Sequence, residues 1–368
     1  MSSRREFLKG AAASGIAFCT CGLLDAAHAQ LSHTHPQAGT KRKPVIFKGK
    51  RVKTIDTHAH CFFHEGIALM GDDAKGVMPP VKGGPEHFIV IEERLKGMDA
   101  MGIDMEVLSI NPFWYRKDRE TAQKICQVHN EKLAELCAQR PDRFAAFASL
   151  PLQAPDLAVQ MLEDAMKKYR LKGAAIGGSV LGDDFSNPNY HPVWAKAEEL
   201  GAVLFIHPQS TPQLASRFKG NGWLSNTIGN PLDTTIALQK LIFEGTLDKY
   251  PGLKLLAAHG GGYLGSYAPR SDHPCFVSPT NCDPSIVLKK KPTEYLNQMY
   301  FDALVFTPEA LRHLVAQVGV SQVMLGTDHP IPWEQYPVDH VMATKTLSDA
   351  QKAAILGGNA AKLFGIPA

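Results

Sequence analysis

Short apolar runs alternate along this chain with longer stretches in which apolar residues recur at helical spacing. The short runs predict eight strands, over residues 52–57, 105–109, 144–150, 173–177, 203–207, 253–258, 299–303 and 322–327. The longer stretches predict helices over residues 92–101, 120–139, 156–169, 192–200, 234–248 and 308–317. Strands that alternate with helices indicate an α/β protein with a parallel sheet. Eight such strands are the number that closes a (β/α)8 TIM barrel.

A doubly wound open sheet is the alternative fold. It would gain support from a phosphate-binding glycine loop, but Gly260-Gly261-Gly262 lacks the G-x-G-x-x-G spacing. We therefore predict one TIM-barrel domain over residues 51–368. A helical tail over residues 349–364 is expected to pack on the outside of the barrel.

The composition fits a large globular domain with an ordinary soluble surface. The chain has 368 residues, of which 44% are hydrophobic, so it can bury a large core. Lys and Arg number 39 against 36 for Asp and Glu, which gives a net charge of only +3. A balance this even gives no electrostatic reason to expect a nucleic-acid partner.

Residues 1–29 resemble a twin-arginine signal peptide. Arg4-Arg5 stands before an apolar stretch over residues 11–24, and Ala27-His28-Ala29 offers a small-x-small cleavage site. The apolar stretch is shorter than the about 20 residues that a membrane-spanning helix needs. We expect a periplasmic protein with no membrane segment after cleavage. Residues 30–50, with their Pro, Gly and basic residues, are interpreted as a linker.

The cysteines limit the possible disulfides. Cys19 and Cys21 would leave with the signal peptide, and the five that remain are an odd number, so at least one thiol stays unpaired. Cys126 and Cys137 lie eleven residues apart on one predicted helix, too far to pair. Cys275 and Cys282 flank a loop and are able to pair.

Histidines and one aspartate fall where predicted strands end. His58 and His60 end the first strand, and their spacing of two places both side chains on one face. His207 ends the fifth strand, His259 the sixth and Asp328 the eighth. Each of these residues alone could be an ordinary core residue. A second H-x-H pair, His33 and His35, lies in the linker with no predicted strand before it, and we interpret it as solvent-exposed. Together the residues at the strand ends predict a metal site, because TIM barrels carry their active sites at the carboxyl ends of the strands.

Imidazoles with one carboxylate suit zinc or another borderline divalent ion, manganese among them. Such an ion lowers the pKa of a bound water molecule and polarises substrate oxygens.

From residue 52 to residue 366 the chain resembles amidohydrolase family 2, in particular its aminocarboxymuconate-semialdehyde decarboxylase branch. The most specific stretches are residues 55–60, 205–208, 258–262, 300–305 and 325–330. Three features depart from the family pattern. Gln209 stands in place of a tryptophan, and His329-Pro330-Ile331 stands in place of Tyr-Pro-Phe. The family's second arginine, from the partner subunit, would fall near residues 79–84, where Lys82 alone offers a positive charge.

The resemblance implies a TIM barrel of the metal-dependent hydrolase type, with a single metal ion held by His58, His60, His207 and Asp328. It also implies that His259 is a proton-transferring residue beside the metal and not a ligand, with Asp328 sharing the proton transfer. A structural role for His259 beneath the glycine turn is the alternative. The resemblance further implies a homodimer, and it makes Arg270 the residue that binds a substrate carboxylate.

Aromatic residues in the loops after predicted strands are candidates for holding a flat substrate, and Trp114 is the one we select. Plain packing beneath a long loop is the alternative for each of them. The full set is Phe62, Phe63, Phe113, Trp114 and Trp223.

The functional prediction is a metal-dependent, non-oxidative decarboxylase (a carboxy-lyase) acting on a small unsaturated or aromatic carboxylic acid. The same metal centre also suits a hydrolase of a lactone, amide or ester. A non-catalytic exported binding protein is the third class, and the intact set of ligands argues against it.

Overall fold

The computed structural model describes residues 44–76 and 86–367. The predicted signal peptide, the linker up to residue 43, the His33 and His35 pair and Lys82 lie outside the described residues. The described residues belong to one compact unit.

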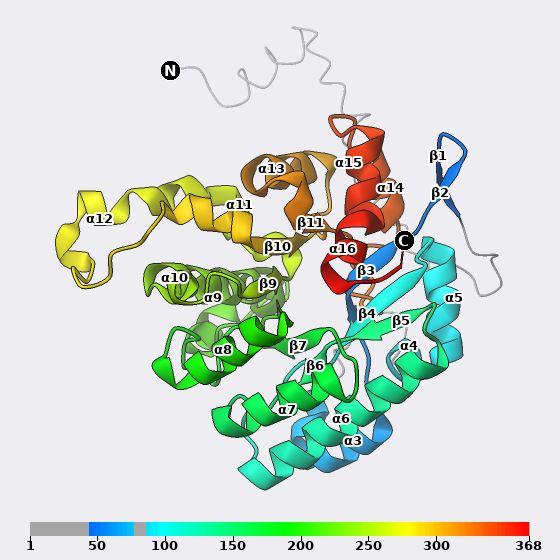
Figure 1. The fold of residues 1–368 in the computed structure, drawn as a ribbon, viewed down its shortest axis with the longest axis horizontal. Helices are drawn as coiled ribbons and strands as arrows, with labels where there is room; N and C mark the ends of the chain where they lie inside the picture. Colours follow the sequence, from blue (N-terminus) through cyan, green and yellow to red (C-terminus); the bar gives the residue numbers. More distant parts are fainter. Residues whose placement is uncertain (1–43, 77–85, 368) are drawn as a thin grey trace, which may run out of the picture. The chain divides into compact units, whose positions relative to one another are not determined.

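Parallel strands form the centre of this unit and can be followed from blue to orange in Figure 1. Two consecutive parallel ladders join them, β3-β4-β5 and β6-β7-β8-β9-β10-β11. The strands are β3 (Ile55–His60), β4 (Met105–Ser109), β5 (Phe144–Ala146), β6 (Ala148–Ser149), β7 (Gly173–Ile176), β8 (Val203–Ile206), β9 (Lys254–Ala257), β10 (Met299–Asp302) and β11 (Val323–Met324). Strands β5 and β6 correspond to the single predicted strand over residues 144–150.

The two ladders close into a barrel. Between β5 and β6, the Phe147 amide donates to the Leu108 carbonyl at 2.8 Å and so continues the pairing with β4. At the other junction, the Thr57 amide donates to the Leu325 carbonyl at 2.9 Å, and the His60 amide to the His329 carbonyl at 2.7 Å. With both junctions hydrogen-bonded, the predicted (β/α)8 TIM barrel is confirmed.

Helices follow the strands, and most of them cover the outside of the barrel. The apolar faces of these helices and the outward side chains of the strands form one continuous core. The helices are α3 (His64–Met70), α4 (Glu86–Ile89), α5 (Ile91–Met101), α6 (Arg119–Gln139), α7 (Pro155–Lys167), α8 (His191–Leu200), α9 (Asn230–Phe243), α10 (Thr246–Lys249), α11 (Leu264–Tyr267), α12 (Pro274–Val277), α13 (Pro308–Val318), α14 (Pro337–Ala343), α15 (Asp349–Ala353) and α16 (Asn359–Phe364).

A second, smaller core lies inside the barrel, and the end of the chain is part of it. Inward-facing side chains such as Val107 and Phe205 pack there with Phe364 and Ile366. The rings of Phe147 and Phe364 lie 5.6 Å apart. The expectation that the tail packs only on the outside is therefore wrong for α16, because its apolar side chains are buried against the inward faces of the strands.

Two features lie outside the repeating barrel units. The last residues of the predicted linker belong to an antiparallel hairpin, β1 (Val45–Phe47) and β2 (Lys50–Val52). Farther along, Cys275 and Cys282 form a disulfide with a Cα–Cα distance of 5.6 Å, while Cys126 and Cys137 are free thiols. Within the described ranges, no helix is long and apolar enough to cross a membrane.

Candidate metal centre

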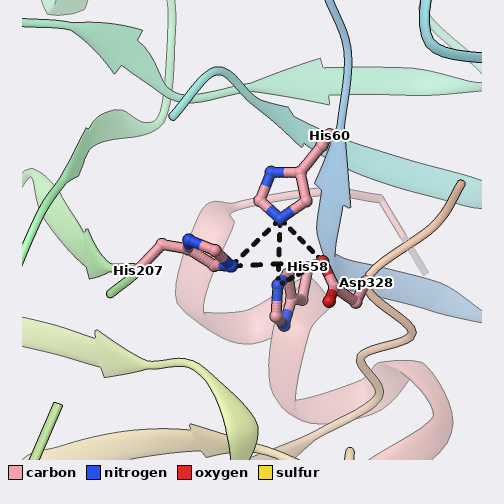
Figure 2. Close-up of side chains that lie close together, drawn as sticks. All are labelled: His58, His60, His207 and Asp328. Carbon is pink, nitrogen blue, oxygen red and sulfur yellow. Dashed lines mark hydrogen bonds and ion pairs between the residues drawn. The ribbon is translucent and has the colours of Figure 1, made fainter. Parts of the chain in front are cut away.

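Four side chains converge at the carboxyl ends of the barrel strands (Figure 2). His58 and His60 come from β3, His207 follows β8, and Asp328 lies in the loop after β11. Their candidate ligand atoms all lie within 4.8 Å of one another. His60 Nε2 is 3.2 Å from the Nε2 atoms of both His58 and His207, and 2.8 Å from Asp328 Oδ1. The structure thus brings together all four predicted ligands.

Neighbouring residues fix which nitrogen each imidazole offers. Asp302, the last residue of β10, lies with its Oδ2 2.6 Å from His58 Nδ1. Asp302 is itself held by the backbone amides of His259 and Gly260 at 2.8 and 2.9 Å. The Ser109 hydroxyl lies 2.9 Å from His60 Nδ1. Both contacts direct Nε2 toward the centre of the cluster, as in metal sites where the second ring nitrogen is hydrogen-bonded.

The charges of the cluster suit a cation. Burial lowers the pKa of His60 and His207, which keeps both imidazoles neutral and able to act as ligands. For His58, burial is outweighed by the carboxylates of Asp328 and Asp302, which raise its pKa to about 10. Burial also favours the neutral form of Asp328, but the imidazoles around it, His58 first, hold its pKa well below the usual range. A divalent ion would displace the proton of His58 when it binds.

The four ligand residues have the composition of a metal site, and a carboxylate oxygen among them lacks a well-placed hydrogen-bond donor. Asp328 Oδ1 is buried with His60 Nε2 at 2.8 Å and His58 Nε2 at 3.2 Å, but it accepts no hydrogen bond of good geometry from either ring. A buried carboxylate oxygen without a well-placed donor is costly, and a cation bound among the three imidazoles would satisfy it. Three imidazoles and one carboxylate are also a ligand set that zinc takes.

His259 lies beside this cluster but does not belong to it. Its Nε2 is 3.7 Å from Asp328 Oδ2, and its ring centroid is 5.0 Å from that of His58. The residue has a left-handed backbone, φ 55°, and three glycines with positive φ follow it. A side chain at Gly262 would collide with the Pro231 carbonyl, so the turn that presents His259 requires glycine there. This placement fits the predicted proton-transfer role, which stays a prediction.

A cavity of about 410 Å³ opens onto the cluster, with His60, His207 and Asp328 in its wall. Aromatic rings and uncharged polar groups make up most of the remaining lining, as in many small-molecule sites. The aromatic lining residues are Phe62, Phe88, Phe113, Tyr115 and Trp223.

The prediction for Trp114 is wrong. Its side chain is fully buried, its indole Nε1 donates to the Leu150 carbonyl at 2.9 Å, and its ring packs on His129. The neighbouring residues Phe113 and Tyr115 line the cavity instead. Sequence alone could not tell which residue of this loop faces inward, because the loop has no fixed period.

Arg270 does not line the cavity of the single chain. It lies in a 3-10 turn after α11, is exposed, and holds its guanidinium 5.8 Å from the centre of the Tyr267 ring. The cavity lining contains Arg116, an exposed residue in the loop after β4. The single chain therefore offers Arg116, and not Arg270, as a cation beside the site.

Sequence reasoning missed three residues of the site. Asp302 and Ser109 were not proposed, although both stand at strand ends, the same signal that identified Asp328. Asp233, near the start of α9, lines the cavity, and burial raises its pKa to about 6. Its Oδ2 accepts a hydrogen bond of 3.0 Å from the Gln209 amide. No sequence signal separates it from a surface acid on a helix.

A TIM barrel with three imidazoles and one carboxylate at the carboxyl ends of its strands defines a class of enzyme, one that binds a single divalent metal ion. Comparisons with known proteins then identify the family. The family model described as amidohydrolase (Amidohydro_2) matches residues 55–366. This chain therefore belongs to that family and is an enzyme of the amidohydrolase superfamily.

Named relatives agree with this assignment. The chain is 32% identical to 2-amino-3-carboxymuconate-6-semialdehyde decarboxylase of Dictyostelium discoideum, over 74% of this chain and 76% of the relative. It is also 32% identical to gamma-resorcylate decarboxylase of Rhizobium radiobacter, over 74% of this chain and 86% of the relative. Among solved structures, dihydroxybenzoic acid decarboxylase of Polaromonas sp. JS666, with bound manganese and 2-nitroresorcinol, matches with a TM-score of 0.75. That match has 28% identity and covers 86% of this chain and 97% of the other.

Proposed function

We propose that this enzyme is a metal-dependent, non-oxidative decarboxylase of a small unsaturated or aromatic carboxylic acid. The observation that carries the proposal is the placement of the ligand cluster, which forms part of the wall of an aromatic-lined cavity. A flat ring or diene fits between aromatic side chains, and its carboxylate would then approach the cluster.

The reaction replaces a bond from carbon to CO2 with a bond from the same carbon to hydrogen. A bound divalent ion supplies positive charge that holds and polarises the substrate oxygens. The chain supplies the proton: His259 is placed to donate it, and the carboxylate of Asp328, whose Oδ2 lies 3.7 Å from His259 Nε2, shares in the transfer by accepting a proton. No oxidant is needed, because the electron pair of the broken bond stays on the substrate carbon when CO2 leaves and then binds the proton.

The relatives favour this reaction over the hydrolase alternative. All three named above are decarboxylases. For the ion, three imidazoles and a carboxylate favour zinc, while the Polaromonas structure holds manganese. We propose zinc as the resident ion, with manganese as the second candidate, and elemental analysis of the protein as purified distinguishes them.

A substrate panel tests the reaction type. The metal-loaded protein is incubated with hydroxybenzoic acids, unsaturated dicarboxylic acids, and lactones and esters of matched size, while CO2 and free acid are measured in parallel. The proposal expects CO2 from at least one acid, and no CO2 from the His58→Ala variant. Hydrolysis of a lactone or ester with no CO2 from any acid would replace the proposal with the hydrolase.

We also propose that the enzyme is a homodimer. The segment from α11 to the residues after the disulfide carries large apolar side chains in the solvent, which is unusual for a free surface. The exposed fractions are 65% for Tyr267, 87% for Phe276, 74% for Val277 and 82% for Val287. Sedimentation velocity measures the assembly state, and a monomer at micromolar concentration would contradict this proposal.

Export to the periplasm by the twin-arginine route is proposed on the sequence of residues 1–29 alone. The Cys275–Cys282 disulfide is compatible with an oxidising compartment.

A further inference from the structure

A connected set of buried polar side chains lies directly behind the metal centre, on the helix side of the barrel wall. Side chains alternate along β4, so Glu106 faces away from the inner core that contains Met105 and Val107. Glu106 instead meets Arg94 of α5, and both side chains are fully buried. We call this set the back network; its members are Asp56, Arg94, Glu106, Thr327 and His329.

One half of the back network holds His60. Arg94 NH1 lies 2.6 Å from one carboxylate oxygen of Glu106, and the Arg94 NH2 group donates to the backbone carbonyl of His60. The other Glu106 oxygen lies 2.6 Å from Nδ1 of His329, the residue after Asp328. The Arg94–Glu106 ion pair thus connects the backbone of His60 to His329, the residue next to Asp328.

The other half holds His58. Asp56 Oδ1 accepts a 2.9 Å hydrogen bond from the His58 amide, and Asp56 Oδ2 accepts one of 2.5 Å from the Thr327 hydroxyl. The same hydroxyl accepts a hydrogen bond of 3.0 Å from the His329 amide. Asp328 is therefore fixed on both sides, by Thr327 before it and His329 after it.

These contacts cross the junction where the barrel closes. Strand β11 is only two residues long, and beyond it only a few backbone hydrogen bonds join the following loop to β3, such as that from the Asp328 amide to the His58 carbonyl at 2.8 Å. Asp328 also has a left-handed backbone, φ 63°, which a non-glycine residue holds only when its surroundings enforce it. The back network supplies side-chain contacts across this junction.

Stability alone is a poor reason for such a network. Arg94 is buried together with Glu106, whose pKa falls to about 2 because the charges of Arg94 and His329 outweigh its burial. Replacing a buried ion pair with apolar side chains of equal volume is often neutral or stabilising. A role in geometry accounts for the placement better, because the contacts end on the backbone of ligand residues.

We propose that the back network consists of positioning residues that set the relative placement of His58, His60 and Asp328 around the metal ion. This inference rests on the metal centre of the proposed function but not on the identity of the substrate or the reaction type.

The test uses Glu106→Gln, which keeps the shape of the side chain and removes its charge. The readouts are the zinc dissociation constant, from chelator competition, and the visible absorption spectrum of the cobalt(II)-substituted protein, which reports ligand geometry. Loss of a group that orients ligands typically weakens metal binding by about 10- to 100-fold. We expect a loss of that size in Glu106→Gln, together with an altered cobalt spectrum.

The matched control is Asp99→Asn. Asp99 lies on the same helix and pairs with Arg143 at 2.7 Å, but neither residue contacts a predicted ligand in the described interactions. This variant should keep the wild-type zinc affinity and cobalt spectrum, even if its melting temperature falls.

Thr327→Val is the second variant, in case Glu106→Gln fails to fold. It keeps the branched shape and removes the hydroxyl that joins Asp56 to His329, so it should also change the cobalt spectrum. Wild-type zinc affinity and an unchanged spectrum in every folded back-network variant would overturn the inference. Neither readout depends on turnover, so a failure to find CO2 release would count against the proposed function alone.

Discussion

His259 Nε2 lies 3.7 Å from Asp328 Oδ2, just beyond hydrogen-bond distance, and His259 stands outside the ligand cluster. His259→Asn should therefore retain the metal ion and the fold while losing turnover, and removal of a general acid or base typically costs about 10²- to 10⁴-fold in rate. Metal content, melting temperature and kcat measure the three properties.

His207→Asn is the matched comparison, because it removes a predicted ligand through the same substitution. It should lose both the ion and turnover. Loss of metal in His259→Asn would make His259 a ligand, and a near-normal kcat would make it structural.

Two exposed arginines are candidates for binding the substrate carboxylate. The structure favours one of them, and the family resemblance favours the other. Arg116 lines the cavity and Arg270 does not. Arg116→Ala should lower kcat/KM for an acidic substrate by tens-fold, the size expected for a lost charge-assisted pair of about 2 kcal/mol. Arg270→Ala should leave the kinetics unchanged. The reverse pattern, measured by steady-state kinetics on one substrate, would restore Arg270 as the carboxylate-binding residue.

Of the individual site residues, those at the ends of strands could be predicted from the sequence, and the others could not. His58, His60, His207 and Asp328 follow apolar runs whose ends meet at one rim of the barrel, so their convergence was predictable. The side-chain directions of loop residues were not predictable, which is why Trp114 was misassigned. Contacts between distant segments, such as Arg94 with Glu106, have no local pattern at all.

Among the elements, helix α16 has an unusual position, since it adds side chains to the inner core of the barrel. Phe364 is 6% exposed and packs against Phe147. Phe364→Ala should lower the free energy of unfolding by about 3–5 kcal/mol, as expected for a large aromatic side chain removed from a core.

Lys362→Ala on the same helix is the control, because Lys362 is exposed and its loss should change stability little. Chemical denaturation followed by fluorescence gives both values. Equal stability of the two variants would show that α16 does not contribute to the inner core.

The apolar pattern predicted the strands and the long helices because burial on one or both faces fixes their period. Residues 349–364 showed the same helical pattern, but an amphipathic pattern does not indicate which surface of the barrel the apolar face packs against. The hairpin of β1 and β2 was also missed, since three-residue strands are too short to show a period.

For the whole molecule, export is the prediction that depends on residues 1–29. Replacing Arg4 and Arg5 by lysine should trap uncleaved precursor in the cytoplasm, because the arginine pair is the recognised feature of the predicted signal. Cell fractionation with immunoblotting measures the distribution. Normal export of the double variant would mean that the segment is not a twin-arginine signal.

The central claim is that a single divalent ion held by His58, His60, His207 and Asp328 supports decarboxylation. The most direct test is CO2 release from an active acid, measured while metal-free enzyme is titrated with zinc or manganese. We expect no CO2 from the metal-free protein, and CO2 release that rises to a plateau at about one ion per chain, in keeping with a mononuclear site. CO2 release that is unaffected by chelation would contradict the claim, as would full metal loading without CO2 from any acid of the panel.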